Sequence, residues 1–199
     1  MSRILVTGGR GFIGRRVLAP LVAAGYEVHA VGRLPAVVPG VTWHSADLTA
    51  DPASCVVASR PEVLLHLAWC TEHGRFWTAP ENVVWVEASL ALLRAFADCG
   101  GRRAVIAGTC AEYDWGTDRE AFDERATPIL PATLYGRAKA ALHQVAEGLG
   151  AQAGFEVAWG RVFFPYGSDE AEGRLVTSVA RALLAGETAR TARVVSSAI

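Results

Sequence analysis

The stretch Thr7–Gly14, TGGRGFIG, decides the fold. It directly follows a short β-branched run and opens an apolar stretch with helical spacing. Glycines permit a tight turn and a close approach of the backbone to a pyrophosphate, while a helix amino terminus offers free N–H groups and partial positive charge. This strand–turn–helix context predicts a dinucleotide-binding site. Its glycines fit both GxGxxG and GxxGxxG, and the residues concerned are Gly8, Gly9, Gly11, Phe12, Ile13 and Gly14.

Outward from this turn, strand-like and helix-like patterns alternate along the chain. The expected strands are Ser2–Thr7, Glu27–Val31, Val41–His44, Val63–Ala68, Ala104–Ala107 and Phe155–Trp159, and the expected helices are 12–24, Pro52–Ser59, 82–98, Leu134–Leu149 and 172–185. Such alternation with short links predicts an α/β fold, a doubly wound parallel sheet with helices on both faces. The loops Trp69–Glu81 and Tyr113–Thr133 are unusually long, as ligand-binding loops at the carboxyl ends of strands often are.

Composition narrows the class of protein. The chain has 199 residues, 51% hydrophobic and 20% charged, and a net charge of −1. This balance gives no electrostatic case for binding nucleic acid or an anionic membrane. No apolar run approaches the ~18 residues of a spanning helix, and the first apolar run is too short for a signal peptide. We therefore expect a cytoplasmic protein of one domain, or of one domain plus an incomplete second.

The cysteines and histidines show no metal-binding spacing. Neither a CxxC pair nor an HExxH or HxH pattern is present, so no metal site is expected. Scattered thiols fit a reducing compartment, where all but Cys110 are expected to be buried thiols, and Cys110 is expected to pack near the site. The cysteines are Cys55, Cys70, Cys99 and Cys110.

The end of the second expected strand bears on the choice of cofactor. A carboxylate there would bind the ribose 2′-hydroxyl of NAD, but the chain has Gly32 followed by Arg33. A guanidinium can pair with a 2′-phosphate, and Arg10 in the turn is a second candidate. This favours NADP, with NAD as the alternative and a solvated Arg33 as the plainer interpretation. Further candidate cofactor contacts are Asp47 and Leu48 near the adenine, and Leu67 and Ala68 beneath the cofactor.

Tyr135 and Lys139 lie four residues apart, on one face of an expected helix. A phenol with a pKa near ~10 is a poor acid–base group at neutral pH. A neighbouring ammonium and an oxidised nicotinamide would lower that pKa. Thr109, after the fifth expected strand, could supply a hydroxyl to the substrate oxygen. Alone, the spacing equally describes a half-buried tyrosine beside a solvated lysine.

Taken together, these motifs resemble the extended short-chain dehydrogenase/reductase family of nucleotide-sugar epimerases, dehydratases and ketoreductases. The matching pieces are TGGRGFIG, ADL, HLAW, AGTCAEY, LYGRAK and RVFFPYG, within residues 3–167. The resemblance implies a Rossmann domain with Thr109, Tyr135 and Lys139 as catalytic residues and Tyr135 as the acid–base. It also implies that residues 163–166, including Phe163, line the nicotinamide side, and that helices 82–98 and 134–149 form a homodimer interface.

Departures from the family pattern narrow the expected reaction. Dehydratases of this family carry Asp-Glu directly after the threonine, whereas this chain has Cys110 and Ala111, with Glu112 one place later. This argues against 4,6-dehydration. Enzymes that epimerise and reduce have a cysteine two places after the hydroxyl residue, so Cys110 is not assigned an acid–base role. The segments GTCAEYDW and ATLYGRAK resemble 4-ketoreductases of the CDP-abequose synthase type most closely.

We therefore predict an NAD(P)H-dependent reductase of a nucleotide-activated 4-keto-6-deoxy sugar. An NAD-dependent nucleotide-sugar epimerase and a catalytically impaired dinucleotide-binding module remain alternatives. Family members continue into a longer substrate lobe, so residues 1–167 are expected to form the cofactor domain and 168–199 an incomplete lobe. Phe164 stands where many members have an asparagine. Phe76, Trp77 and Trp85 could stack on a nucleotide base or sugar, with core or dimer packing as the alternative for Trp85.

Overall fold

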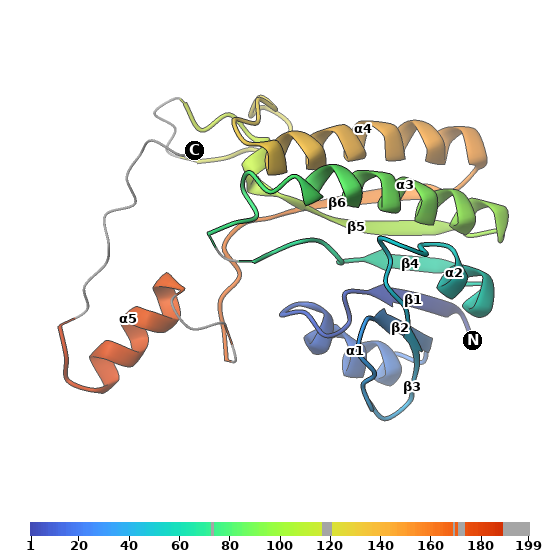
Figure 1. Cartoon of the computed structure of the whole chain (residues 1–199), viewed down its shortest axis with the longest axis horizontal. Coiled ribbons are helices and arrows are strands. Elements are labelled where there is room, and N and C mark those ends of the chain that lie inside the picture. The colour runs from blue at the N-terminus through green and yellow to red at the C-terminus, as the bar shows by residue number, and fades with distance from the viewer. Residues whose placement is uncertain (73, 117–120, 169, 171–173, 189–199) are drawn as a thin grey trace.

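The computed structural model describes residues 1–72, 74–116, 121–168, 170 and 174–188. Its six strands form one parallel sheet in the order β3-β2-β1-β4-β5-β6 (Figure 1). The elements are β1 (Arg3–Thr7), α1 (Gly14–Ala23), β2 (Glu27–Gly32), β3 (Val41–Ser45), α2 (Ser54–Ser59), β4 (Val63–His66), α3 (Glu81–Asp98), β5 (Arg103–Thr109), η1 (Cys110–Glu112), α4 (Leu134–Ala153), β6 (Glu156–Val162) and α5 (Leu175–Leu184). The doubly wound α/β fold is therefore confirmed, with the expected strand and helix types in the expected order.

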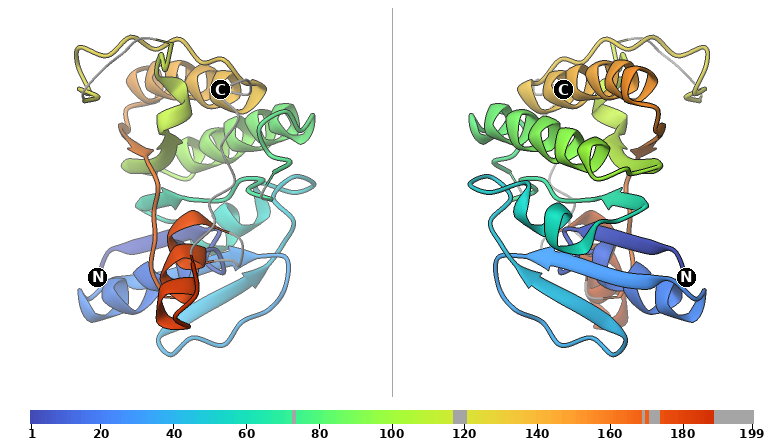
Figure 2. Two further views of the ribbon diagram at one scale, coloured as in Figure 1. Left: turned by 90° about the vertical axis from the view of Figure 1, so that its left-hand side faces the viewer. Right: turned by 90° about the vertical axis from the view of Figure 1, so that its right-hand side faces the viewer.

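The sheet separates two apolar cores. Strand β1 alternates between them, because Leu5 packs with Phe96 of α3 while Ile4 and Val6 pack with Leu18 of α1. Helices α2, α3 and α4 cover the face opposite α1, as right-handed crossovers require (Figures 1 and 2). Both cores keep the strands in one register, so that all six strands end at the same edge of the sheet.

Most strand boundaries differ from those expected by one to three residues, and the ends of β4 and β5 bear on the site. β4 ends at His66, two residues early, because the Thr7 hydroxyl accepts hydrogen bonds from the N–H groups of Leu67 and Ala68. β5 extends two residues further at its carboxyl end, so that its last residue, Thr109, pairs with Val162. Thr109 thus ends the strand instead of following it.

Helix ends follow from caps and glycines. The Thr133 hydroxyl accepts a hydrogen bond from the Gly136 N–H at the start of α4, and Gly154 ends that helix with φ +82°. α1 begins at Gly14, not at residue 12, because residues 12 and 13 belong to the preceding turn.

The last helix differs from the rest. α5 lies beyond the carboxyl edge of the sheet and buries none of its residues (Figure 1). The expected domain boundary at residues 167–168 stays a prediction, and residues 169, 171–173 and 189–199 of the expected lobe lie outside the described residues. Within the part of the chain that the structure describes, no helix is long and apolar enough to cross a membrane.

Candidate active site

The glycine-rich turn leaves no room for side chains. Gly8 has φ +69°, and a Cβ there would lie 2.9 Å from the Ala68 nitrogen. A Cβ on Gly14 would lie 2.2 Å from the Gly8 carbonyl oxygen, and one on Gly11 would lie 3.1 Å from the same atom. The turn therefore packs its backbone directly against Leu67 and Ala68, which follow β4, whereas their predicted contact with the cofactor stays a prediction.

In the first turn of α1, the N–H groups of Arg15 and Arg16 bond the carbonyl oxygens of Gly11 and Ile13. The N-cap residue of this helix, Ile13, makes no side-chain cap, and the first turn carries no acidic residue. An uncapped helix amino terminus behind a glycine cradle fits a pyrophosphate, because the N–H groups and the helix dipole both favour an anion. These residues therefore fit the dinucleotide that the motif predicts.

A series of buried hydrogen bonds joins the residues next to this turn to the sheet and to α3. Thr7 accepts two backbone N–H groups, so its own proton goes to His66 Nδ1 at 2.7 Å. His66 Nε2 then carries the ring proton and donates to the Ser89 hydroxyl at 2.8 Å. Burial lowers the pKa of His66 to about 3, with the charge of Lys139 acting in the same direction. His66 is thus a neutral structural link between β1, β4 and α3.

The surface beside the carboxyl end of β2, which we call the rim, carries two arginine side chains. Arg33 is exposed, and Arg10 donates from Nη1 to the Pro35 carbonyl at 3.2 Å. Hydrogen bonds from Thr49 lower the pKa of Asp47, and Arg33 adds to this effect from nearby. Asp47 therefore turns its carboxylate toward Thr49. The other predicted adenine contact, Leu48, is buried in the core with Val31, Cys55 and their neighbours.

Tyr135 and Thr109 meet at the carboxyl edge of the sheet. Thr109 caps η1, accepting a hydrogen bond from the Ala111 N–H at 3.2 Å. A Cβ on Gly136 would lie 2.3 Å from the Ala111 carbonyl oxygen. Only a glycine at this position lets the first turn of α4 reach η1, which places Tyr135 next to Thr109.

Aromatic rings enclose Tyr135. The rings of Trp69, Phe76 and Trp77 pack edge-on against it, with centroid distances of 6.5, 4.9 and 5.9 Å. Burial raises the pKa of Tyr135, and a hydrogen bond with Thr109 opposes this effect. The enclosing rings therefore outweigh the Thr109 hydrogen bond, and the lowering of this pKa by Lys139 together with an oxidised nicotinamide stays a prediction.

Lys139 is buried and turned toward the sheet. Its Nζ donates to the Ala107 carbonyl oxygen at 2.8 Å and lies 3.8 Å from the centre of the Trp69 ring. Burial lowers the pKa of Lys139 to about 7, and the Glu112 carboxylate opposes this effect. The predicted contact of Lys139 with a nicotinamide ribose stays a prediction.

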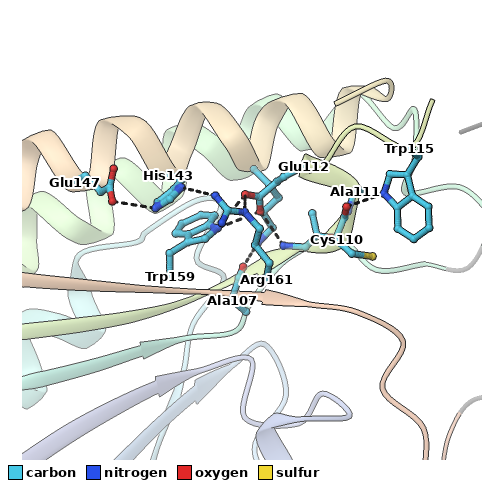
Figure 3. A network of polar contacts seen from close by, with 11 residues as sticks. Ala107, Cys110, Ala111, Glu112, Trp115, His143, Glu147, Trp159 and Arg161 are labelled. Carbon is cyan, nitrogen blue, oxygen red and sulfur yellow. Dashed lines mark hydrogen bonds and ion pairs between the residues drawn. The ribbon is translucent and has the colours of Figure 1, made fainter. Parts of the chain in front are cut away.

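Glu112 anchors a chain of polar contacts behind the site (Figure 3). Its fully buried carboxylate accepts hydrogen bonds from the Thr109 N–H at 2.8 Å, from Trp159 Nε1 at 3.1 Å and from Arg161 Nε at 2.9 Å. Arg161 then contacts His143 Nδ1 at 3.3 Å, and His143 Nε2 contacts Glu147 at 3.2 Å. These protein partners already occupy Glu112, which leaves it a positioning group rather than a free base.

Two further aromatic predictions have different outcomes. Trp85 stacks on Trp69 at a centroid distance of 6.0 Å and packs against the core, which favours its packing interpretation. Trp77 borders a cavity of about 250 Å³, together with Tyr113, Trp115 and Arg137. The stacking of Trp77 on a nucleotide base or sugar stays a prediction.

The segment after β6 lies near the glycine turn. Gly167 lies close to the Phe12 ring, and Arg16 hydrogen-bonds the Ser168 backbone. Phe163 and Phe164 are exposed, at 41% and 69%, and the Phe163 ring packs against Tyr113. The glycine turn, predicted to bind the pyrophosphate, and Phe163, predicted to line the nicotinamide side, therefore lie at the same edge of the sheet.

Several residues that shape the site were not predicted. Trp69, Gly136 and Arg161 lie within the matching pieces HLAW, LYGRAK and RVFFPYG, but no role was predicted for them because each acts through a contact made only in the folded chain. Cys110 is buried, and burial raises the pKa of its thiol, in keeping with its predicted packing role. Lys139 carries a signal that could have strengthened its prediction: it is the only lysine in a chain with 19 basic residues.

The fold and the site define a dinucleotide-binding α/β protein with a candidate acid–base site. One parallel sheet carries the glycine-rich turn, a helix that starts without a side-chain cap and a helix with the tyrosine–lysine pair. Residues 4–197 match the sequence model described as the NAD dependent epimerase/dehydratase family. The chain belongs to this family.

Individual relatives agree with this family. The chain is 32% identical over 176 residues to a UDP-glucose 4-epimerase of Streptomyces lividans, covering 83% of this chain and 51% of that protein. It is 26% identical over 186 residues to dTDP-6-deoxy-L-talose 4-dehydrogenase (NAD(+)) of Aggregatibacter actinomycetemcomitans, covering 90% of this chain and 67% of the relative. A solved structure of MoeE5 with UDP-glucuronic acid and NAD has a TM-score of 0.77 at 28% identity, covering 93% of this chain and 62% of that one. The chain thus spans between half and two thirds of the length of these proteins.

Proposed function

We propose that this chain carries the cofactor site and catalytic residues of an NADPH-dependent oxidoreductase. Its substrate would be a nucleotide-linked 4-keto-6-deoxy sugar, reduced at C4. The observation that carries the proposal is the buried Tyr135 hydroxyl beside Thr109. Burial raises the pKa of Tyr135, so the phenol is protonated at neutral pH. A protonated phenol is the form that a reduction requires of its proton donor.

The proposed residue roles follow from this arrangement. When bound, NADPH supplies the hydride for the carbonyl carbon. Tyr135 donates its proton to the carbonyl oxygen, which becomes the alcohol, and the Thr109 hydroxyl holds that oxygen. Lys139, with a pKa of about 7, can return a proton to Tyr135 and binds the nicotinamide ribose. The glycine turn and the uncapped start of α1 hold the pyrophosphate.

Two observations support the substrate class. One curated relative is named as a 4-dehydrogenase of a 6-deoxy sugar nucleotide, and the reverse of such a reaction is a 4-keto reduction. The cavity beside Trp77, Tyr113 and Trp115 offers aromatic surfaces that stack on sugars and bases. The occupied carboxylate of Glu112 also fits a reaction without water elimination.

A second candidate function is nucleotide-sugar 4-epimerisation with NAD. Another curated relative and several solved structures with the same fold are named UDP-glucose or UDP-galactose 4-epimerases. The two candidates differ in what they consume, because a reductase uses one NADPH per turnover whereas an epimerase regenerates its cofactor. The predicted dimer through α3 and α4 also stays a proposal.

The deciding experiment offers the purified chain NADPH with CDP- and dTDP-linked 4-keto-6-deoxy sugars, and separately offers it NAD with UDP-glucose. Loss of NADPH absorbance with a 4-keto sugar would support the reductase. Conversion of UDP-glucose to UDP-galactose without net cofactor loss would favour the epimerase. Cofactor binding without either reaction would indicate the impaired binding module.

Tyr135→Phe tests the proposed proton donor. We expect kcat to fall by roughly 10²–10⁴-fold, because general acid catalysis contributes about that much. The Kd for NADPH should stay within about threefold, since the ring is kept. Tyr26→Phe is the matched control, because Tyr26 precedes β2 at the opposite end of the sheet. Equal kcat values for the two variants would remove Tyr135 from the mechanism.

A further inference from the structure

The indole ring of Trp43 lies under two glycines of the cofactor region. Trp43 stands on β3 opposite Ala30 of β2. A Cβ on Gly32 would lie 3.0 Å from Cζ2 of this ring, and a Cβ on Gly9 would lie 3.2 Å from Cζ3. The six-membered part of the indole thus fills the space that a side chain at either position would need.

Packing alone holds this ring in place. Trp43 Nε1 is buried and has no hydrogen-bond partner among the described residues. The ring packs against the α1 side of the sheet, in the cluster that contains Ile4, Val28 and Ala30. Trp43→Phe would therefore remove the ring edge that touches Gly9 and Gly32 without breaking a hydrogen bond.

Trp43 restricts position 32, which lies at the end of β2, where dinucleotide-binding domains distinguish NAD from NADP. A carboxylate at the end of β2 binds the ribose 2′-hydroxyl of NAD and repels the 2′-phosphate of NADP. Here that position is Gly32, and the neighbouring groups on the rim are the guanidiniums of Arg33 and Arg10. Asp47, across the rim, already accepts two hydrogen bonds from Thr49.

We propose that Trp43 is a specificity-determining residue for the cofactor. By occupying the space beside Gly32, its ring restricts this position to glycine, so that no carboxylate stands at the end of β2 and the arginines meet a 2′-phosphate without competition. This inference rests on the NADPH preference in the proposed function and deepens it. Trp43 acts through position 32 and through Gly9, without touching the reacting atoms. One consequence is that substituting Gly32 alone does not convert the site to NADH.

The test is a double-mutant cycle over Gly32→Asp and Trp43→Phe. The dissociation constants of NADPH and NADH are measured for the whole chain by nicotinamide fluorescence. In the wild type and in Trp43→Phe, we expect NADPH to bind at least about tenfold tighter than NADH. In Gly32→Asp, NADPH binding should fall at least about tenfold with no gain for NADH, because the ring blocks the carboxylate. In the double variant, NADH binding should rise at least about tenfold over Gly32→Asp.

If Trp43 had a purely structural role, adding Trp43→Phe to Gly32→Asp would change the binding of both cofactors alike and leave their ratio as it is in Gly32→Asp. Gly148→Asp is the control for an added charge, because Gly148 on α4 is exposed and a Cβ there would meet no atom within 4 Å. Thermal unfolding without cofactor verifies that each variant folds. It should also show that Gly32→Asp is less destabilising in the Trp43→Phe background.

Two results would overturn the inference, and they separate it from the proposed function. If Gly32→Asp alone gains NADH binding as strongly as the double variant, Trp43 does not restrict position 32. If the wild type prefers NADH, the cofactor preference itself is wrong and this inference falls with it. If the predicted pattern of binding holds but no 4-keto sugar is reduced, the proposed reaction fails while the role of Trp43 stands.

Discussion

The glycine-rich turn and the tyrosine–lysine site lie at the same edge of one sheet, but they are built in opposite ways. The turn is made by backbone within eight consecutive residues, Thr7–Gly14, whose close approaches exclude side chains. The second site is made by side chains from β5, η1, α4, β6 and the loop before α3. A short motif can therefore specify the first site, whereas the second depends on long-range packing.

The two regions also differ in the titratable groups that they contain. The turn holds no group that titrates near neutral pH, and its backbone offers a ligand N–H donors and a helix dipole. The second site buries Tyr135, Lys139 and Glu112 together, and burial moves the pKa of Tyr135 upward and that of Lys139 downward to about 7. Perturbed protonation of this kind is typical of functional sites, and here it depends on the aromatic rings and the buried ion pair around it.

The largest expected effect comes from breaking the buried pair behind the second site. Glu112→Ala leaves the guanidinium of Arg161 and the N–H of Thr109 without their shared acceptor. Removing one partner of a buried pair costs about 3–5 kcal/mol, so the free energy of unfolding should fall by that amount in urea titration. Glu147→Ala, at the exposed end of the same chain of contacts, should cost less than about 1 kcal/mol. Similar losses for both would show that the network does not support the site.

The next effect tests the turn. Gly14→Ala places a methyl group against the Gly8 carbonyl, a backbone atom that cannot move aside. Overpacking of this kind costs about 1–3 kcal/mol, and NADPH affinity should fall with it because the turn must open. Gly148→Ala is the matched control in open space on α4, where alanine should stabilise the helix by about 0.5–1 kcal/mol. A neutral Gly14→Ala would mean that the turn is not tightly packed.

The features that could be predicted from the sequence are those made by local contacts, and the features that could not are those made by long-range packing. The fold class and the cofactor turn were predicted from periodicity and from glycines close together in the chain. The pair of Tyr135 and Lys139 was found because it lies on one helix. The protonation of that pair could not be predicted, since it depends on Trp69 and Glu112, which lie far away in the sequence. The end of β4 also differed, because the Thr7 hydroxyl accepts hydrogen bonds from the N–H groups of Leu67 and Ala68.

Lys139 provides a prediction about pH that applies to the second site alone. Its pKa of about 7 in the folded chain lies below the value of ~10.4 in an unfolded chain. Between these values the unfolded state binds more protons, so this residue makes the free energy of unfolding rise with pH, by up to ~1.4 kcal/mol per pH unit. Lys139→Met should lose this rise, which is measured as the difference between the two proteins from about pH 7 to pH 9.

Because Lys139 is the only lysine, labelling lysine with carbon-13 gives one side-chain resonance. Its chemical shift should titrate near pH 7 in the free chain, and its midpoint should change when NADPH binds if Nζ moves to the ribose. The glycine turn offers no such titration. A midpoint near the ordinary value for lysine, or equal pH profiles for wild type and Lys139→Met, would contradict the burial of this ammonium.

The smallest expected effect comes from the link between the two regions. Ser89→Ala removes the acceptor of His66 Nε2, which leaves a buried N–H without a partner. The expected cost is about 1 kcal/mol, because His66 keeps its bond to Thr7 and a neutral ring loses less than a charge would. Ser45→Ala, at an exposed position of β3, is the control and should change the stability by less than about 0.5 kcal/mol. If Ser89→Ala instead weakens NADPH binding more than it lowers stability, the polar chain through His66 positions the turn, and the two regions are coupled rather than merely adjacent.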